Sequence, residues 1–192
     1  KKSAQSQGDP DLAIFGVPGH FQGYYPGYSR DTFQRDQFTW AVLKGHNRNN
    51  AGRVTLRSKD PLETPQIDFN SFDRATDPQG RDLEAVLEGV KMARKISKRI
   101  GASFIVKNEL APGADVETDD ELRGFIMRES WGHHASCTNP IGADNDSSAV
   151  LDGDFRVRGV KNLRVVDASM FPKTPGLFIV LPPPFRCHGS TV

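Results

Sequence analysis

The sequence predicts an α+β fold: a mostly antiparallel sheet with helices on one of its faces. Short strand patterns come first, two helical patterns occupy the middle of the chain, and short strand patterns return at the end. Residues 53–58 alternate strictly, with Val54 and Leu56 on one face and polar side chains on the other, which is typical of a half-buried antiparallel strand. No internal repeat interrupts this order, so one sheet-and-helix domain is the expected architecture.

Four further segments carry strand patterns. Residues 12–17 form a short apolar run ended by Pro18, and residues 38–43 form a second run. Residues 65–69 are expected to be an edge strand, because Pro65 at the start of the strand lacks a backbone donor. Residues 163–166 are the clearest strand pattern in the C-terminal part.

Two segments are predicted to be helical. In residues 82–100 apolar side chains recur at steps of three and four, and Gly101 follows as a stop. A shorter helix is expected from Thr118, because Thr118 and Glu121 have the spacing of a capping box. Its buried stripe would be Leu122, Phe125 and Ile126.

Composition sets the class of protein. The chain has 192 residues, 36% of them hydrophobic, which suffices for a core, and we expect a single domain over residues 11–182. Residues 1–10 are expected to be disordered or a linker, and residues 183–192 an irregular tail. The net charge of +1 gives no reason to expect a nucleic acid or an anionic membrane as partner. No bilayer-spanning run and no signal peptide is visible, and the two cysteines leave the compartment open.

An aromatic loop between the first two strands is one candidate site. Phe21, Tyr24, Tyr25 and Tyr28 lie there among glycine and proline residues. They either pack over the sheet, which is the commoner role of aromatic side chains, or line a pocket for an apolar small molecule. Tyr24 and Tyr25 are the pocket candidates.

The adjacent pair His133 and His134 is the other candidate, because imidazole exchanges protons near neutral pH. A metal site with Cys137 is disfavoured, since neighbouring histidines point apart and no second ligand pair follows, so no metal is expected. Ser136 lacks the glycines of a nucleophile elbow. On residue chemistry alone, a structural pair with one ring bonded to the backbone is favoured over these functional roles.

Several motifs in the correct order resemble the C-terminal part of the glucose–methanol–choline (GMC) oxidoreductase family. They occupy residues 131–138 (WGHHASCT), 149–152, 155–160 and 162–172, and residues 51–61 with 65–67 resemble the family's entry into its substrate-binding sheet. The resemblance covers about residues 12–182.

The resemblance implies an alcohol oxidation in which FAD takes a hydride and a histidine handles the hydroxyl proton. The family's His-Pro-x-Gly-Thr element matches His134 to Thr138, so its catalytic histidine falls on His134, with His133 as the neighbouring candidate. The Val-Val-Asp-Ala-Ser turn implies that Asp167 and Ala168 lie beside the flavin.

The sequence departs from the family in three places. It has no Gly-x-Gly-x-x-Gly turn, so the N-terminal Rossmann unit that anchors FAD is expected to be lacking. Phe178 stands where the family places a second histidine or asparagine, and we assign it to the substrate pocket instead. Three prolines, Pro182 to Pro184, exclude the family's closing helix.

Two functions follow, with a third arrangement beside them. The first is the substrate-binding, catalytic-histidine portion of an FAD-dependent alcohol oxidoreductase, inactive in redox chemistry by itself. The alternative is a stand-alone protein without cofactor, redeployed as an isomerase, cyclase, lyase or small-molecule binder with His134 as acid/base. The third arrangement is a subunit that completes its site with a separate FAD-binding chain.

Overall fold

The computed structural model describes residues 1–32, 36–100, 106–132 and 134–177. The chain divides into two compact units, Lys1–Trp131 and Gly132–Val192, where the sequence suggested a single domain over residues 11–182. Phe178 and the proline-rich tail lie outside the described residues. Within the described ranges, no helix is both long enough and apolar enough to cross a membrane.

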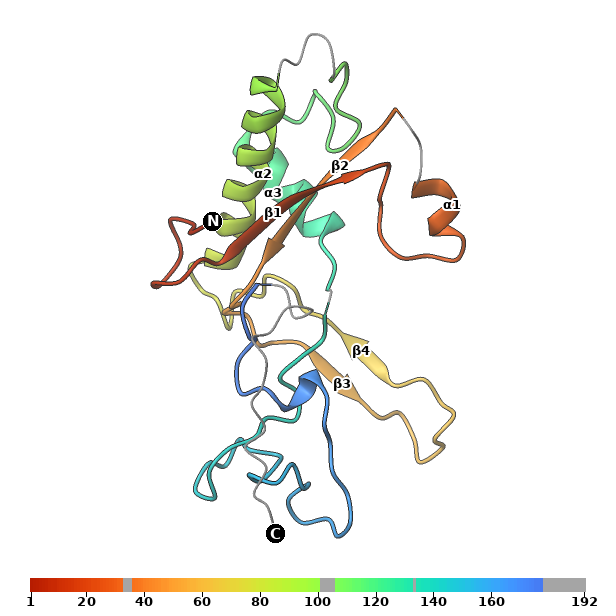
Figure 1. Cartoon of the computed structure of the whole chain (residues 1–192), viewed down its shortest axis with the longest axis vertical. Helices are drawn as coiled ribbons and strands as arrows, with labels where there is room; N and C mark the ends of the chain where they lie inside the picture. The colour runs from red at the N-terminus through yellow and green to blue at the C-terminus, as the bar shows by residue number, and fades with distance from the viewer. Residues whose placement is uncertain (33–35, 101–105, 133, 178–192) are drawn as a thin grey trace, which may run out of the picture. The chain divides into compact units, whose positions relative to one another are not determined.

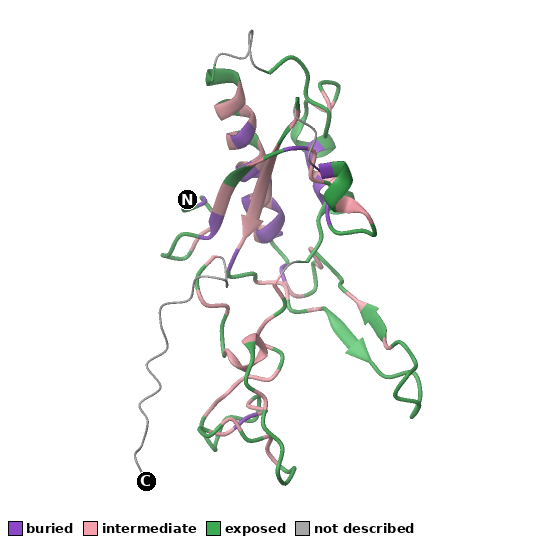
Figure 2. Cartoon of the chain, turned by 45° about the vertical axis from the view of Figure 1, so that its right-hand side comes forward, coloured by how far each residue is buried: buried purple, intermediate pink, exposed green. Residues whose placement is uncertain are grey.

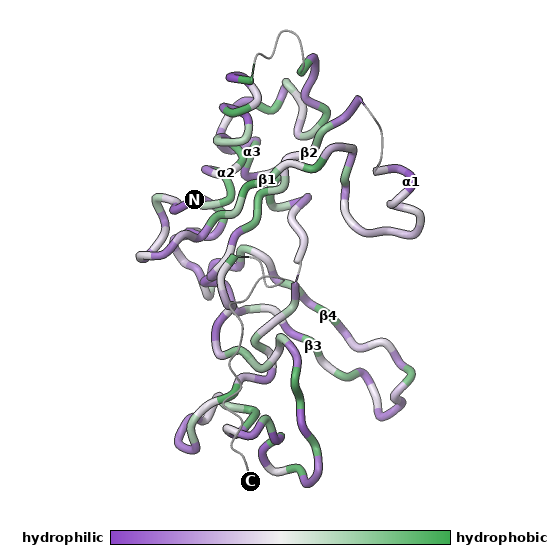
Figure 3. The backbone as a smooth tube through the Cα atoms, in the orientation of Figure 1, coloured by the Kyte–Doolittle hydropathy of each residue, from purple (hydrophilic) through white to green (hydrophobic). Residues whose placement is uncertain are grey.

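A two-stranded antiparallel sheet begins the first unit (Figure 1). β1 (Leu12–Pro18) pairs with β2 (Phe38–Lys44) along its whole length, and the short helix α1 (Tyr28–Thr32) lies between them in the chain. Both strands match the sequence prediction to within one residue. The backbone is hydrophobic along much of β1 (Figure 3), as expected of a strand with a covered face.

Helix α2 (Arg81–Arg99) covers this sheet, packing against both β1 and β2. Gly89 makes the close approach possible, because a Cβ atom there would lie 2.5 Å from Val42 Cγ1. The helix begins after Gly80, whose φ of 62° is left-handed, and Asp77 accepts a hydrogen bond from the first-turn N–H of Asp82 at 2.9 Å.

Helix α3 (Asp119–Glu129) packs against α2 and completes the core. Thr118 and Glu121 form the complete capping box, with the Thr118 hydroxyl accepting from the Glu121 N–H, as the sequence predicted. Buried residues gather on these two helices (Figure 2). The core cluster consists of Leu83, Leu87, Leu122 and Ile126, each at most 4% exposed.

A separate hairpin corrects the expectation of one half-buried sheet. β3 (Arg53–Thr55) and β4 (Gln66–Asp68) are antiparallel and shorter than predicted, and they form their own two-stranded sheet. The alternation of the sequence is real, but its apolar face is open: Val54 is 68% exposed and Ile67 is 51% exposed. Alternation separates two faces of a strand but does not supply the layer that would bury one.

The first ten residues are also not the disordered or linking segment that their polarity suggested. Ser3 is only 5% exposed, and its N–H and hydroxyl both donate to the Asp11 carboxylate, at 2.7 and 2.6 Å. Lys1 pairs with Glu88 on α2. A short polar segment of this kind is ordered when a buried carboxylate accepts hydrogen bonds from its N–H and hydroxyl groups.

The described residues of the second unit form mainly turns and isolated bridges. Residues 163–166, predicted as a strand, contribute one bridge, between Arg156 and Arg164. A single 3-10 turn, η1 (Ala168–Met170), follows. Leu151 is completely buried and centres this unit.

Candidate functional site

The second unit brings the two motif segments together. Three backbone N–H groups of the histidine segment donate to three successive carbonyls of η1: Cys137 to Ala168 at 3.2 Å, Asn139 to Ser169 at 2.9 Å, and Ile141 to Met170 at 2.9 Å. The segment containing His134 and the turn containing Asp167 and Ala168 are therefore neighbours, although about thirty residues of chain separate them.

The backbone at His134 has an unusual conformation. Its φ is 58°, and that of Cys137 is 68°, so two non-glycine residues within four positions are left-handed. Such conformations cost about 1–3 kcal/mol each and persist where the surrounding structure fixes them. His134 is half-buried and its Nε2 atom is shielded from solvent. His133, the second catalytic candidate, lies outside the described residues.

Asp167 organises the turn that follows the 163–166 segment. Its Oδ1 atom accepts a hydrogen bond from the Ser169 N–H at 2.8 Å and another from the Ser169 hydroxyl. The bond from that hydroxyl, followed by the one from the N–H, lowers the pKa of Asp167 below its ordinary value of 3.8. The carboxylate is exposed and Ala168 is half-buried, so this turn presents a charge and a small side chain. A role for either residue toward flavin stays a prediction.

The aromatic loop forms a cluster in the first unit. Tyr24 contacts Phe21, Tyr28 and Trp131 edge-to-face, with ring centroids 5.3, 5.0 and 5.7 Å apart. Tyr24 is 60% exposed and Trp131 is 50% exposed, so these rings pack on one another at the surface.

Tyr25, the other pocket candidate, donates its hydroxyl to Asp31 at 2.9 Å, and this bond raises its pKa. Its side chain is 38% exposed. Sequence reasoning missed Trp131 as a member of the aromatic cluster. The available signal was its position directly before the histidine pair.

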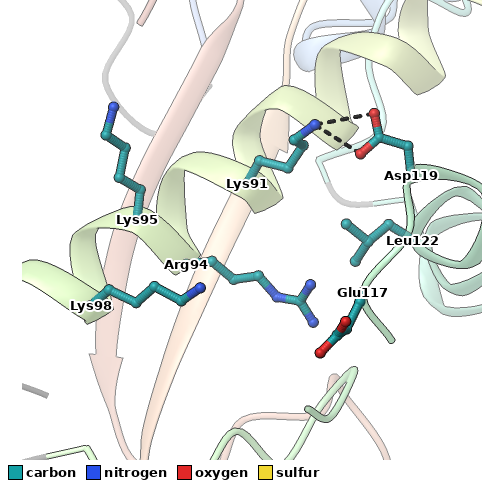
Figure 4. Close-up of a pocket in the computed structure, with 7 residues that line it drawn as sticks. All are labelled: Lys91, Arg94, Lys95, Lys98, Glu117, Asp119 and Leu122. Atoms are coloured by element: carbon teal, nitrogen blue, oxygen red, sulfur yellow. Dashed lines mark hydrogen bonds and ion pairs between the residues drawn. The ribbon is translucent and has the colours of Figure 1, made fainter. Parts of the chain in front are cut away.

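A hollow of about 320 Å³ between α2 and α3 contains none of the residues expected at the site (Figure 4). Lys91 pairs with Asp119 there at 2.8 Å. The Arg94 guanidinium donates to Glu109 and to the carbonyls of Val116 and Gly113. Its donors tie the loop before α3 to α2, which is a structural role. The lining residues are Lys91, Arg94, Lys95, Lys98, Glu117, Asp119 and Leu122.

The helix N-termini bear on whether this chain could hold the pyrophosphate of a dinucleotide. Asp77 accepts from the first turn of α2, and the Asp82 carboxylate lies in that same turn. The first turn of α3 carries Asp119, Asp120 and Glu121. Carboxylates thus surround both termini and repel an anion. Together with the missing glycine-rich turn, the described residues do not fit the pyrophosphate of FAD.

Among the residues that the structure describes, no three histidine, cysteine, aspartate or glutamate side chains gather as a metal-ligand group.

Comparisons with known proteins agree on the family. Choline oxidase from Arthrobacter globiformis is 37% identical over 123 residues, which are 64% of this chain and 22% of the oxidase. Oxygen-dependent choline dehydrogenase from Vibrio vulnificus is 38% identical over 143 residues, or 73% of this chain and 24% of the relative. The enzyme of the same name from Pseudomonas fluorescens is 38% identical and covers 85% of this chain and 28% of its own length.

Structure comparison gives the same result. An FAD-dependent oxidoreductase from Chaetomium thermophilum matches with a TM-score of 0.51 and 31% sequence identity, covering 64% of this chain and 20% of that one. This chain thus spans about a quarter of the length of the curated relatives that it matches. The C-terminal family model of GMC oxidoreductases matches residues 48–182. The chain belongs to the GMC oxidoreductase family.

Proposed function

We propose that this chain is the substrate-side portion of an FAD-dependent alcohol oxidoreductase and that His134 accepts the hydroxyl proton of the alcohol. One observation carries the proposal: the segment of His134 and the turn of Asp167 and Ala168 are joined by three consecutive backbone hydrogen bonds. These are the two segments to which the family resemblance assigns the proton acceptor and the flavin contact.

The chemistry divides between this chain and polypeptide outside it. FAD held by that other polypeptide would supply the hydride acceptor for the alcohol C–H bond, and the His134 imidazole of this chain would take the O–H proton as the carbonyl product forms. The FAD-binding polypeptide is either the remainder of a longer chain or a separate subunit.

The relatives suggest the class of alcohol. Those compared above are named for choline, a quaternary ammonium alcohol, and aromatic rings attract such cations by their faces. The cluster of Tyr24, Phe21, Tyr28 and Trp131 is exposed enough to meet a small molecule, and Asp31 adds a negative charge beside Tyr25. From the names of these relatives we propose a small cationic alcohol as substrate, and Tyr24 and Tyr25 stay candidates for contacting it.

His134→Ala tests the proton acceptor in the flavoprotein that carries this chain. We expect kcat/KM for choline to fall by about 10²–10⁴-fold, because removing a general base typically has that effect. His46→Ala is the matched control: His46 is exposed and also has a left-handed φ, of 55°, so this variant makes the same substitution at a left-handed histidine that has no proposed role. An unchanged rate in His134→Ala refutes the assignment.

The visible spectrum of the purified 192-residue chain tests where FAD is held. We expect no flavin absorbance, since the helix N-termini of this chain carry carboxylates. Bound flavin would contradict that inference. If the 192-residue chain instead converts an added alcohol into another product in the absence of FAD, the flavin-independent alternative is favoured.

A further inference from the structure

We infer that Asn139 is a positioning residue, which sets the place of the His134 segment through a hydrogen-bonded relay to Ser169 and Asp167. The inference rests on the proposed function, because it matters for catalysis only if His134 accepts the proton. It adds residues that the family motif did not single out for a role. Asn139 lies five positions after His134, on the strand-like segment that runs beside η1.

The hydrogen bonds of the relay all run in one direction, from the Asn139 amide through the Ser169 hydroxyl to the Asp167 carboxylate. The Ser169 hydroxyl donates its single proton to Asp167 Oδ1, so its oxygen is left to accept. Asn139 Nδ2 fills that place, donating to Ser169 Oγ at 3.0 Å. Because the backbone N–H of Asn139 also donates to the Ser169 carbonyl, Asn139 and Ser169 are joined at two points. A two-point contact fixes orientation as well as distance.

The relay ends on a charge, which strengthens it. Asp167 is ionised at neutral pH and accepts from both the hydroxyl and the N–H of Ser169. Hydrogen bonds to an ionised acceptor are about twice as strong as neutral ones, and a donor chain polarises toward the charge. The Asn139 amide is thereby held by the same turn that the family resemblance places beside the flavin.

The backbone of the histidine segment needs such an anchor. Left-handed φ values at His134 and Cys137 give the segment a conformation that side chains other than glycine rarely adopt. A strained segment relaxes unless its ends are fixed. The two-point contact at Asn139 fixes the C-terminal end, so loss of the relay would let the His134 side chain drift relative to the turn.

Three variants of the flavoprotein test the relay by kinetics. Asn139→Leu removes the amide donor, Ser169→Ala removes the central hydroxyl, and Ser169→Thr keeps it. We expect the first two to lower kcat about 10- to 100-fold with KM for the alcohol changed less than about twofold, since a misplacement of about 1 Å has effects of this size. Ser169→Thr should retain most of kcat, which a loss of packing would not explain.

The chain contains a matched control for the serine. Ser148 donates its N–H and its hydroxyl to Asp146 Oδ1, at 2.9 and 2.6 Å, in the same Asp-x-Ser arrangement as Asp167 and Ser169. Asp146 and Ser148 lie in the same unit and have no part in the proposed relay. Ser148→Ala should therefore leave kcat and KM at wild-type values.

A second measurement uses the 192-residue chain without FAD. Amide hydrogen exchange in Ser169→Ala should accelerate at least tenfold at Cys137, Asn139 and Ile141 and stay unchanged in β1, whereas Ser148→Ala should leave those three amides protected. If all amides of Ser169→Ala exchange fast, that variant has failed to fold. The measurement is then made on Asn139→Asp, which keeps the shape of the Asn139 side chain but removes its Nδ2 donor.

The outcomes separate the two proposals. If His134→Ala retains full activity, the proposed function fails, whatever the relay variants do. If His134→Ala is inactive while Asn139→Leu and Ser169→Ala keep wild-type kcat, the positioning role of Asn139 is overturned and the proton acceptor stands. Loss of kcat in both relay variants with rescue by Ser169→Thr supports the relay.

Discussion

The contact between α2 and the β1–β2 sheet makes a sharp prediction at Gly89. In a helix interior, replacing glycine by alanine normally stabilises by about 1 kcal/mol. At Gly89 the added Cβ would lie 2.5 Å from Val42 Cγ1, so helix and sheet would have to move apart. Overpacking of this kind costs about 1–3 kcal/mol. Gly89→Ala should therefore leave the free energy of unfolding unchanged or lower it by up to about 2 kcal/mol.

Gly124 in α3 provides the control for helix propensity. A Cβ there would meet only the end of the flexible Arg128 side chain, at 3.4 Å. Gly124→Ala should therefore raise the free energy of unfolding by about 1 kcal/mol, the whole gain expected from helix propensity. The two variants are expected to differ by about 1–3 kcal/mol in urea unfolding followed by far-ultraviolet circular dichroism.

A double variant identifies the cause of this difference. Val42→Ala removes the methyl group that a Cβ at residue 89 would strike, so Gly89→Ala should be less costly in that background than in the wild type. If Gly89→Ala stabilises the protein as much as Gly124→Ala does, the described approach of α2 to the sheet is wrong.

Two further predictions concern the helices. Thr118→Ala should lower the free energy of unfolding by about 1 kcal/mol, because it removes the side-chain acceptor of the capping box, while Thr118→Ser should stay near wild type in the same urea assay. The hydrogen bonds from Arg123 at 2.7 and 2.9 Å lower the pKa of Glu84 below its ordinary value of 4.5. The stabilisation from this pair is therefore complete above about pH 4.5 and is lost as the pH falls through the lowered value. Glu84→Gln should reduce the loss of stability between pH 5 and 3, and a variant with the wild-type pH dependence would exclude this pair as a contributor.

The helices and the first sheet could be predicted because their signals are local. The capping box at Thr118 and the three- and four-residue steps of α2 specify structure within one or two turns of chain. The existence of β1 and β2 also followed from two apolar runs, whereas their pairing was not predicted. These elements match the expectation because neighbouring residues decide them.

Other features depend on residues far apart in the chain. The order of residues 1–10 depends on donors that Ser3 gives to Asp11, and polarity alone gives no sign of it. The exposure of Val54 depends on which layer covers the hairpin, and alternation cannot reveal that. The division into two compact units likewise depends on contacts between distant residues, which the pattern of each single element does not contain.

The residues of the candidate site were assigned by resemblance, and their roles stay predictions. Resemblance to the family named His134, Asp167 and Ala168, and the structure shows their segments side by side. The link from Asn139 to Ser169 spans thirty residues and has no local pattern, so it became visible only in three dimensions. The contact between Tyr24 and Trp131 likewise joins residues far apart in the chain, so no local pattern predicts it.

The open hairpin has a consequence for the behaviour of the isolated chain. β3 and β4 form a two-stranded sheet, so each strand has an outer edge that no third strand in the described ranges pairs. Unpaired edges are templates for strands of other molecules, and the apolar face formed by Val54 and Ile67 would strengthen such pairing. The neighbouring charges of Arg53 and Asp68 oppose it by holding water at the edge. Among the described strands, we therefore expect those of this hairpin to promote aggregation of the isolated chain as its concentration rises.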